Sequence, residues 1–104
     1  MEAACRGAKK GGGTTVGILP GQDKSVANRF LDVVVATGLG HARNFIIAVT
    51  SDALIAVGGR YGTLSEIAAG LNLGRKVVGL NTWNIPGVIT FDSPADAVKS
   101  ALEV

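Results

Sequence analysis

The sequence predicts an α/β protein of three layers, in which helices cover both faces of a mainly parallel sheet of about five strands. Two observations lead to this prediction. Short runs rich in Val, Ile and Leu alternate with segments whose apolar residues recur at helical spacing, the pattern of alternating strands and helices. The run 32–37 also holds four consecutive apolar residues, as is typical of a strand with both faces covered.

The first half of the chain predicts two helices and two strands. Residues 2–10 precede three glycines, which predicts a short helix that ends there. The apolar runs 15–19 and 32–37 are bounded by turn residues and predict strands, while the polar segment 22–30 stays ambiguous. Residues 41–50 carry apolar side chains at positions 42, 45, 46 and 49, which form one face of a helix.

The second half predicts three strands and two helices. The runs 53–57, 76–80 and 88–91 are apolar and predict strands. Residues 63–73 have an apolar stripe and predict a helix, with Gly74 at the position where helices often end in a left-handed residue. Ser93 followed by Pro94 predicts the start of a last helix that runs to about Leu102.

Composition limits the class of protein. The chain has 104 residues, of which 47% are hydrophobic and 17% charged, so we expect a single folded domain over residues 1–104. One cysteine and one histidine cannot form a disulfide framework or a tetrahedral metal site, which favours a reducing, cytoplasmic setting and no bound metal. No apolar run is long enough to cross a membrane. The net charge of +2 is dispersed, which disfavours nucleic acid as a partner.

The strongest functional feature is the run Gly58-Gly59-Arg60-Tyr61-Gly62-Thr63, which lies between a predicted strand and a predicted helix. A glycine-rich turn here directs backbone N–H groups and the positive end of a helix toward solvent, which favours binding of a phosphate. In open parallel sheets such loops lie at the carboxyl ends of the strands, where ligands bind. The alternative is a tight turn that only packs the helix closely against the sheet.

Glu66 follows Thr63 by three residues. Its carboxylate is placed to act on the sugar side of a nucleotide, as a base or as a group that stabilises a cation. The alternative is a capping box, in which Thr63 caps the helix and Glu66 accepts a hydrogen bond from the Thr63 backbone. Both interpretations stay open at this point. Trp83, in a predicted loop, is either a lid or an ordinary packing aromatic.

A second glycine loop precedes the helix predicted at 41–50. Thr37, Gly38 and Gly40 follow a strand, and Arg43 and Asn44 stand in the first turn of the helix. An arginine there opposes the helix dipole unless an anion or carboxylate lies nearby. We therefore count Arg43 and Asn44, with the loop itself, among the candidate residues for binding a phosphorylated ligand.

Two stretches together resemble a known superfamily: Thr37-Gly38-Leu39-Gly40-His41-Ala42-Arg43-Asn44, and Ser51-Asp52 through Gly58-Gly59-Arg60-Tyr61-Gly62-Thr63-Leu64-Ser65-Glu66. The chain is similar to the Rossmann-like superfamily of molybdenum-cofactor carrier proteins and Lonely-Guy phosphoribohydrolases, which are often labelled lysine decarboxylases. The resemblance implies a Rossmann-like fold and a phosphorylated, nucleotide-like ligand. The sequence itself requires no cofactor, and the resemblance implies the molybdenum cofactor or a nucleotide as the bound ligand.

In the phosphoribohydrolases the matching motif is Pro-Gly-Gly-x-Gly-Thr-x-x-Glu, which implies catalytic roles for Glu66 and Arg43 if this chain is a hydrolase. Gly58 replaces the proline and Asn44 replaces the usual lysine, as in the carrier branch. Arg60 departs from both branches, and either crowds a phosphate or adds a cation to it. The resemblance also implies that a first strand–helix–strand unit is absent, which would leave an open sheet edge, so we expect a homodimer or a higher oligomer.

Three functions follow as alternatives. The first is binding of a phosphorylated, nucleotide-like ligand, as in the carriers. The second is N-glycosidic hydrolysis of nucleoside 5′-monophosphates by Glu66 and Arg43. The third is a shortened, non-catalytic subunit of an oligomer. Amino-acid decarboxylation is rejected, because no lysine lies in a loop that would form a pocket for pyridoxal phosphate.

Overall fold

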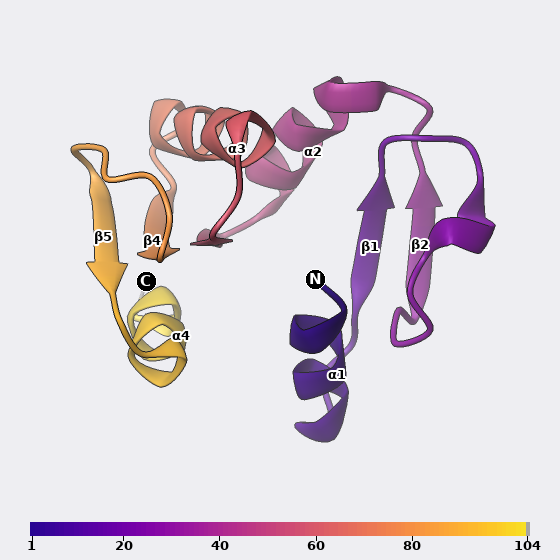
Figure 1. The fold of residues 1–104 in the computed structure, drawn as a ribbon, viewed down its shortest axis with the longest axis horizontal. Helices are drawn as coiled ribbons and strands as arrows, with labels where there is room; N and C mark the ends of the chain where they lie inside the picture. The colour runs from indigo at the N-terminus through magenta and orange to yellow at the C-terminus, as the bar shows by residue number, and fades with distance from the viewer. Residues whose placement is uncertain (104) are drawn as a thin grey trace. The chain divides into compact units, whose positions relative to one another are not determined.

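The computed structural model describes residues 1–103, which form two compact units, residues 1–43 and residues 44–103. The predicted α/β class is confirmed, because every strand pairing in the described part of the chain is parallel. The strands of the first unit form a two-stranded sheet, β1-β2, and those of the second unit form a three-stranded sheet, β3-β4-β5 (Figure 1). Within the units, β1 pairs with β2, and β4 pairs with both β3 and β5.

The first unit contains α1 (Glu2–Lys10), β1 (Val16–Leu19), the short 3₁₀ helix η1 (Lys24–Val26), β2 (Val33–Ala36) and a second 3₁₀ turn, η2 (Gly40–Ala42). The helix α1 ends as the glycines predicted, with Gly12 at φ +80° and its N–H donated to the carbonyl of Lys9. The ambiguous segment 22–30 contains η1, whose start is capped by the Asp23 side chain. The strands pair from Val16 with Val33 to Leu19 with Ala36.

A polar network joins the end of α1 to the start of β2. The Lys9 ammonium lies 2.9 Å from both carboxylate oxygens of Asp32. The same carboxylate accepts a hydrogen bond from the backbone N–H of buried Thr15 at 2.9 Å. These contacts lower the pKa of Asp32, chiefly through the hydrogen bond from Lys9 and then through the Thr15 backbone.

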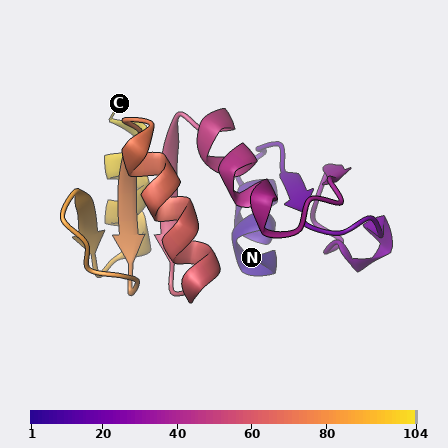
Figure 2. The ribbon, with the colours of Figure 1, turned by 90° about the horizontal axis from the view of Figure 1, so that it is seen from above.

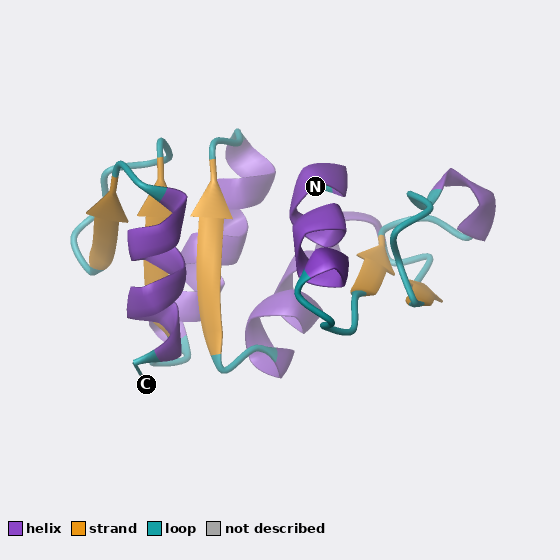
Figure 3. Ribbon diagram, turned by 90° about the horizontal axis from the view of Figure 1, so that it is seen from below, coloured by secondary structure: helices purple, strands orange, loops and turns teal. Residues whose placement is uncertain are grey.

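The second unit contains α2 (Arg43–Thr50), β3 (Ala53–Val57), α3 (Tyr61–Asn72), β4 (Lys76–Leu80), β5 (Val88–Phe91) and α4 (Pro94–Leu102). Seen from above and from below, α3 and α4 lie on opposite faces of the β3-β4-β5 sheet (Figures 2 and 3). The three strands have the predicted bounds. The first residue of α2, Arg43, belongs to the first unit.

The core of the second unit shows why its central strand is apolar on both sides. Val77 and Val78 are adjacent in β4 and both are almost fully buried. Val77 clusters with Ala48 of α2, Leu54 of β3 and Ile67 of α3. Successive side chains of a strand point to opposite faces, so Val78 faces the side that α4 covers, where Ala97 is also fully buried.

Helix ends in this unit follow local signals. Gly74 has φ +73° after the last residue of α3, and the N–H of Arg75 reaches the carbonyl of Gly70 at 2.9 Å, which completes a left-handed cap. The Ser93 side chain accepts a hydrogen bond from the N–H of Asp96, as predicted for the start of α4. At the other end of α4, the Lys76 ammonium donates to the carbonyls of Ser100 and Glu103.

Candidate functional site

The loop between β3 and α3 takes a conformation that favours glycine. Gly58 has φ +55° and Gly59 has φ +91°. The N–H of Gly58 donates to the carbonyl of Leu80 at 3.0 Å, and the carbonyl of Gly58 accepts a hydrogen bond from the Thr82 hydroxyl at 2.6 Å. Both hydrogen bonds connect Gly58 to residues at or just after the end of β4, so the neighbouring strand holds the glycine loop in place.

Gly59 is required by close contact as well as by its backbone conformation. A Cβ atom at this position would overlap the Oγ1 and Cβ atoms of Thr63. No residue with a Cβ atom fits here without movement of the first turn of α3, so the position requires glycine. The tight-turn interpretation therefore explains Gly59 whether or not a ligand binds.

The helix α3 begins at Tyr61, two residues earlier than predicted, and its N-cap residue Arg60 makes no side-chain cap. The first N–H groups of a helix have no partner within the helix, and they form its positive end. Thr63 is the third helical residue, so the N-cap lies at Arg60 and not at Thr63. The helix starts earlier because Gly58 and Gly59 complete the turn before Tyr61. Glu66 lies half-buried in the second turn.

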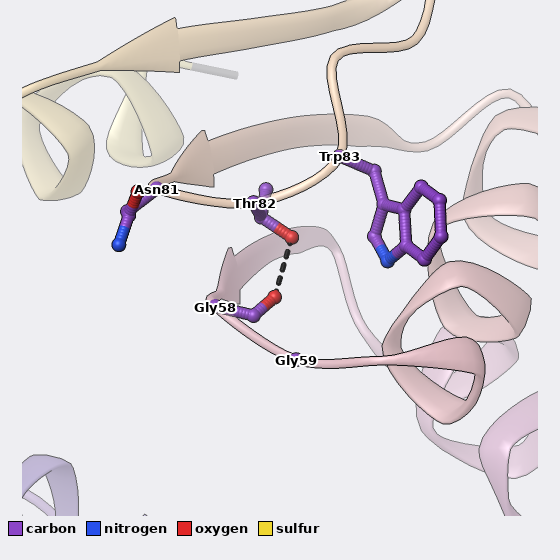
Figure 4. A pocket seen from close by; sticks show the side chains of 5 residues that line it. All are labelled: Gly58, Gly59, Asn81, Thr82 and Trp83. Carbon is purple, nitrogen blue, oxygen red and sulfur yellow. Dashed lines mark hydrogen bonds between the residues drawn. The ribbon is translucent and has the colours of Figure 1, made fainter.

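A pocket opens where this loop meets the segment that follows β4. Its volume is about 460 Å³, and it is lined by Gly58, Gly59, Asn81, Thr82 and Trp83 (Figure 4). Small-molecule sites have volumes of roughly 300–1,000 Å³, and the volume of this pocket lies within that range. The pocket lies at the carboxyl ends of two parallel strands, the place expected for a ligand in such a sheet.

Sequence reasoning missed Asn81 and Thr82 as candidate site residues. Asn81 has φ +48°, and among the described residues it alone has a positive φ without being glycine. Strained backbone of this kind gathers at functional sites. The available signal was the position of these polar residues directly after a buried parallel strand that neighbours the glycine loop.

Trp83 packs against the core and also forms part of the pocket wall. Its indole Nε1 donates to the carbonyl of Arg60 at 3.0 Å, and its ring centroid lies 6.0 Å from that of Tyr61 at an interplanar angle of 31°. Trp83 also packs against the core cluster of this unit. The Arg60 side chain is exposed, and Arg60 is not among the residues that line the pocket.

Asn44 contacts the first turn of α3 from α2. Its side chain is 4% exposed, and its Nδ2 donates to the Ser65 hydroxyl at 3.0 Å and to the Gly62 carbonyl at 3.4 Å. The Oδ1 of Asn44 is buried and has no hydrogen-bond partner in the described part of the chain. The amide therefore fixes the start of α3.

The remaining predicted candidates belong to the first unit. The Thr37 hydroxyl donates to the carbonyl of Leu19 at 2.7 Å, and the N–H groups of Gly38 and Gly40, both at positive φ, donate to the turn at Pro20 and Gly21. Arg43 donates from NH1 to the carbonyl of Ile18 at 2.8 Å. Its Nε is buried without a hydrogen-bond partner among residues 1–103. These residues fasten the loop that follows β2 to strand β1 and to the turn after β1.

Two features are absent from the described residues. Within residues 1–103 no group of three or more His, Cys, Asp or Glu side chains is arranged to hold a metal ion. None of the described helices has the length and apolar character needed to span a membrane.

Parallel strands, and a glycine loop that lines a pocket and leads into a helix, define the second unit as a Rossmann-like ligand-binding fold. The chain belongs to the SLOG cluster4 family, whose model matches residues 1–103. A protein from Archaeoglobus fulgidus, described as uncharacterized, is 50% identical over 100 residues, which are 95% of this chain and 66% of that protein. The chain thus spans slightly less than two thirds of that relative's length.

Solved structures confirm the fold and the superfamily that the motifs predicted. The molybdenum cofactor binding protein from Rippkaea orientalis matches with a TM-score of 0.87 and 35% identity, over 96% of this chain and 68% of that one. The molybdenum cofactor carrier protein from Chlamydomonas reinhardtii matches with a TM-score of 0.80 and 35% identity, over 100% of this chain and 71% of that one.

Proposed function

We propose that this chain binds a phosphorylated, nucleotide-like small molecule, with its phosphate at the loop Gly58–Thr63. The observation that carries the proposal is the start of α3, which has no side-chain cap from Arg60 and follows two left-handed glycines that line a pocket of about 460 Å³. Free N–H groups and the positive end of a helix stabilise an anion at such a place. Gly62 and Thr63 lie in the first turn and add backbone and hydroxyl donors.

The molybdenum cofactor is the first ligand to test, as cargo rather than as a resident group. It carries a phosphate, and two similar structures are described as a binding protein and a carrier protein for it. The pocket walls suit the phosphate and a ring, since they combine glycine backbone, an amide, a hydroxyl and an indole. Thr37, Gly38, Gly40, Arg43 and Asn44 stay predicted binding residues for the same class of ligand.

Titration calorimetry with 5′-AMP, GMP and inorganic phosphate tests the proposal, and the molybdenum cofactor follows under anaerobic conditions. Arg60→Glu places a negative charge at the start of α3, so we expect several-fold weaker binding of each ligand. Lys99→Glu makes the same change of charge at an exposed position on α4 and should leave affinity unchanged. No heat from any of these ligands with the wild-type chain contradicts the proposal.

Hydrolysis of the N-glycosidic bond is the second candidate function. Its support is the position of Glu66, half-buried in the second turn of the helix that follows the glycine loop. In this reaction AMP and water give adenine and ribose 5-phosphate, while a carboxylate stabilises the cationic sugar. Adenine release by the wild type and none by Glu66→Gln supports the reaction. Equal rates of the two proteins would leave binding as the function.

We also propose that the chain works as a homodimer or higher oligomer in the cytoplasm. Each sheet leaves a strand edge without a ladder partner among the described residues, and unpaired edges favour association. The single cysteine, Cys5, is a buried free thiol, which suits a reducing compartment. Light scattering at micromolar concentration tests the assembly, and a stably folded monomer would rule it out.

A further inference from the structure

We propose that the indole of Trp83 stacks on the ring of the bound ligand. The pocket then selects phosphate esters of a planar nitrogen heterocycle over sugar phosphates that carry no such heterocycle. This inference rests on the proposed phosphate site at Gly58–Thr63. Trp83 lines the pocket together with Gly58 and Gly59, and its side chain is half-buried. An indole face in a ligand pocket is a stacking surface for bases and related heterocycles.

The indole is held in place before any ligand arrives. Its Nε1 donates to the Arg60 carbonyl at 3.0 Å, the Tyr61 ring lies against it at 6.0 Å between centroids, and the core supports it from within the unit. A side chain already fixed by such contacts loses little conformational freedom on binding, so its contact energy is retained as affinity.

Trp83 is also close to the proposed phosphate site. Arg60, whose carbonyl accepts the indole N–H, is the N-cap of α3 and the last residue before the helix. One hydrogen bond therefore connects the indole to the helix start that would hold the phosphate. A phosphate bound there brings the part of the ligand attached to it within reach of the indole.

Asn81 provides a polar group on the other side of Thr82. Figure 4 shows Asn81 and Trp83 at the two ends of the segment after β4, with Gly58 and Gly59 across from them. The exposed carboxamide of Asn81 has both a donor and an acceptor, the combination that pairs with the edge of a purine or a pterin. Stacking on the indole requires a flat heterocycle, which a sugar phosphate lacks.

Trp83 is the single tryptophan of the chain, so its fluorescence reports directly on the pocket. In the wild-type protein we expect 5′-AMP to quench this emission and ribose 5-phosphate to leave it nearly unchanged. Calorimetry should show AMP binding more tightly than ribose 5-phosphate by about ten-fold, the scale of one base–aromatic stack.

Variants separate stacking from support of the fold. Trp83→Leu should weaken AMP binding about ten-fold and leave ribose 5-phosphate binding unchanged. Trp83→Phe removes the hydrogen bond to Arg60 but keeps an aromatic face, so it should retain the preference for AMP. Phe45→Leu, which truncates an exposed aromatic on α2, is the matched control and should change neither affinity.

The outcomes distinguish this inference from the function on which it rests. Equal wild-type affinity for AMP and ribose 5-phosphate would overturn the role of Trp83 and leave the phosphate site intact. Equal weakening of both ligands by Trp83→Leu would reduce Trp83 to a support of the loop and also overturn it. Absence of binding by either ligand to the wild type would overturn both proposals.

Discussion

The Thr63 hydroxyl occupies the space that a side chain on Gly59 would need. The first turn of α3 and the glycine loop are therefore packed against each other at the Thr63 side chain, and the loop conformation depends on the residue at position 59. Gly58 is different, because a Cβ atom there would meet nothing within 4 Å. Glycine is needed at position 59 because of both steric contact and a positive φ, and at position 58 because of the positive φ alone. Substitutions at the two positions can distinguish these causes.

Alanine substitutions in this loop should therefore differ in their effect on stability. Gly59→Ala combines an overlap with a left-handed φ and should lower the free energy of unfolding by about 2–3 kcal/mol. Gly58→Ala meets only the left-handed φ and should cost about 1 kcal/mol. Gly62→Ala lies within α3 with its nearest contact at 3.8 Å, so it should cost nothing or stabilise by up to about 1 kcal/mol. Urea denaturation gives the order, and equal stability of the Gly59 and Gly62 variants would refute it.

The parts of the fold that could be predicted are those determined by local chemistry. The bounds of β3, β4 and β5 follow from apolar runs that end at polar or turn residues, and the start of α4 follows from the Ser93 cap before Pro94. The start of α3 was placed two residues late, because Tyr61 and Gly62 are poor helix formers. Contacts from outside the helix hold that first turn, namely Trp83 on the Arg60 carbonyl and Asn44 on the Gly62 carbonyl.

The candidate site was predicted in part, for a similar reason. Gly58, Gly59 and the start of α3 carry a glycine pattern visible in one stretch of sequence. The other wall, Asn81 to Trp83, becomes part of the pocket only through the parallel pairing of β3 with β4, which brings Leu80 opposite Val57.

Asn44 should behave as a buried polar tie between α2 and α3. Asn44→Ala removes the hydrogen bonds to Ser65 and Gly62 and should lower the free energy of unfolding by about 1–2 kcal/mol. Asn44→Asp places a carboxyl in the same buried position, where burial raises its pKa. The folded state then favours the neutral acid, so this variant should lose stability progressively as the pH rises above about 4. Thermal melts between pH 4 and 7 check this, with Asn44→Ala as a reference that should show no such loss.

The Lys9–Asp32 pair should make the stability of the first unit sensitive to acid. The pKa of Asp32 is lowered in the folded state, mainly by the hydrogen bond from Lys9. A lowered pKa stabilises the fold above the ordinary carboxyl value of 3.8, and this contribution disappears as the pH falls through the folded value. The wild type should therefore lose stability below about pH 4. Lys9→Met should shift the pKa of Asp32 back toward its ordinary value, as measured by NMR titration of the carboxyl.

Salt gives an independent check of the same pair. The Lys9 and Asp32 side chains are 41% and 35% exposed, so the attraction between them is screened by ions. Raising the salt concentration at pH 6 should narrow the difference in melting temperature between the wild type and Lys9→Met. A difference that stays constant from low to high salt would assign the effect to packing of the lysine stem.

Gly79 and Thr82 should be energetically coupled, because a Cβ atom on Gly79 would lie 2.8 Å from the Thr82 methyl and 3.0 Å from the Val88 Cγ1. Gly79→Ala should therefore cost about 1–3 kcal/mol of stability. Thr82→Ser removes the methyl but keeps the hydroxyl that donates to Gly58, so the double variant should recover part of that loss. Thr82→Val keeps the methyl and removes the hydroxyl, and it should give no recovery. A double-mutant cycle in urea measures the coupling, and equal recovery by serine and valine would show that the methyl contact does not limit position 79.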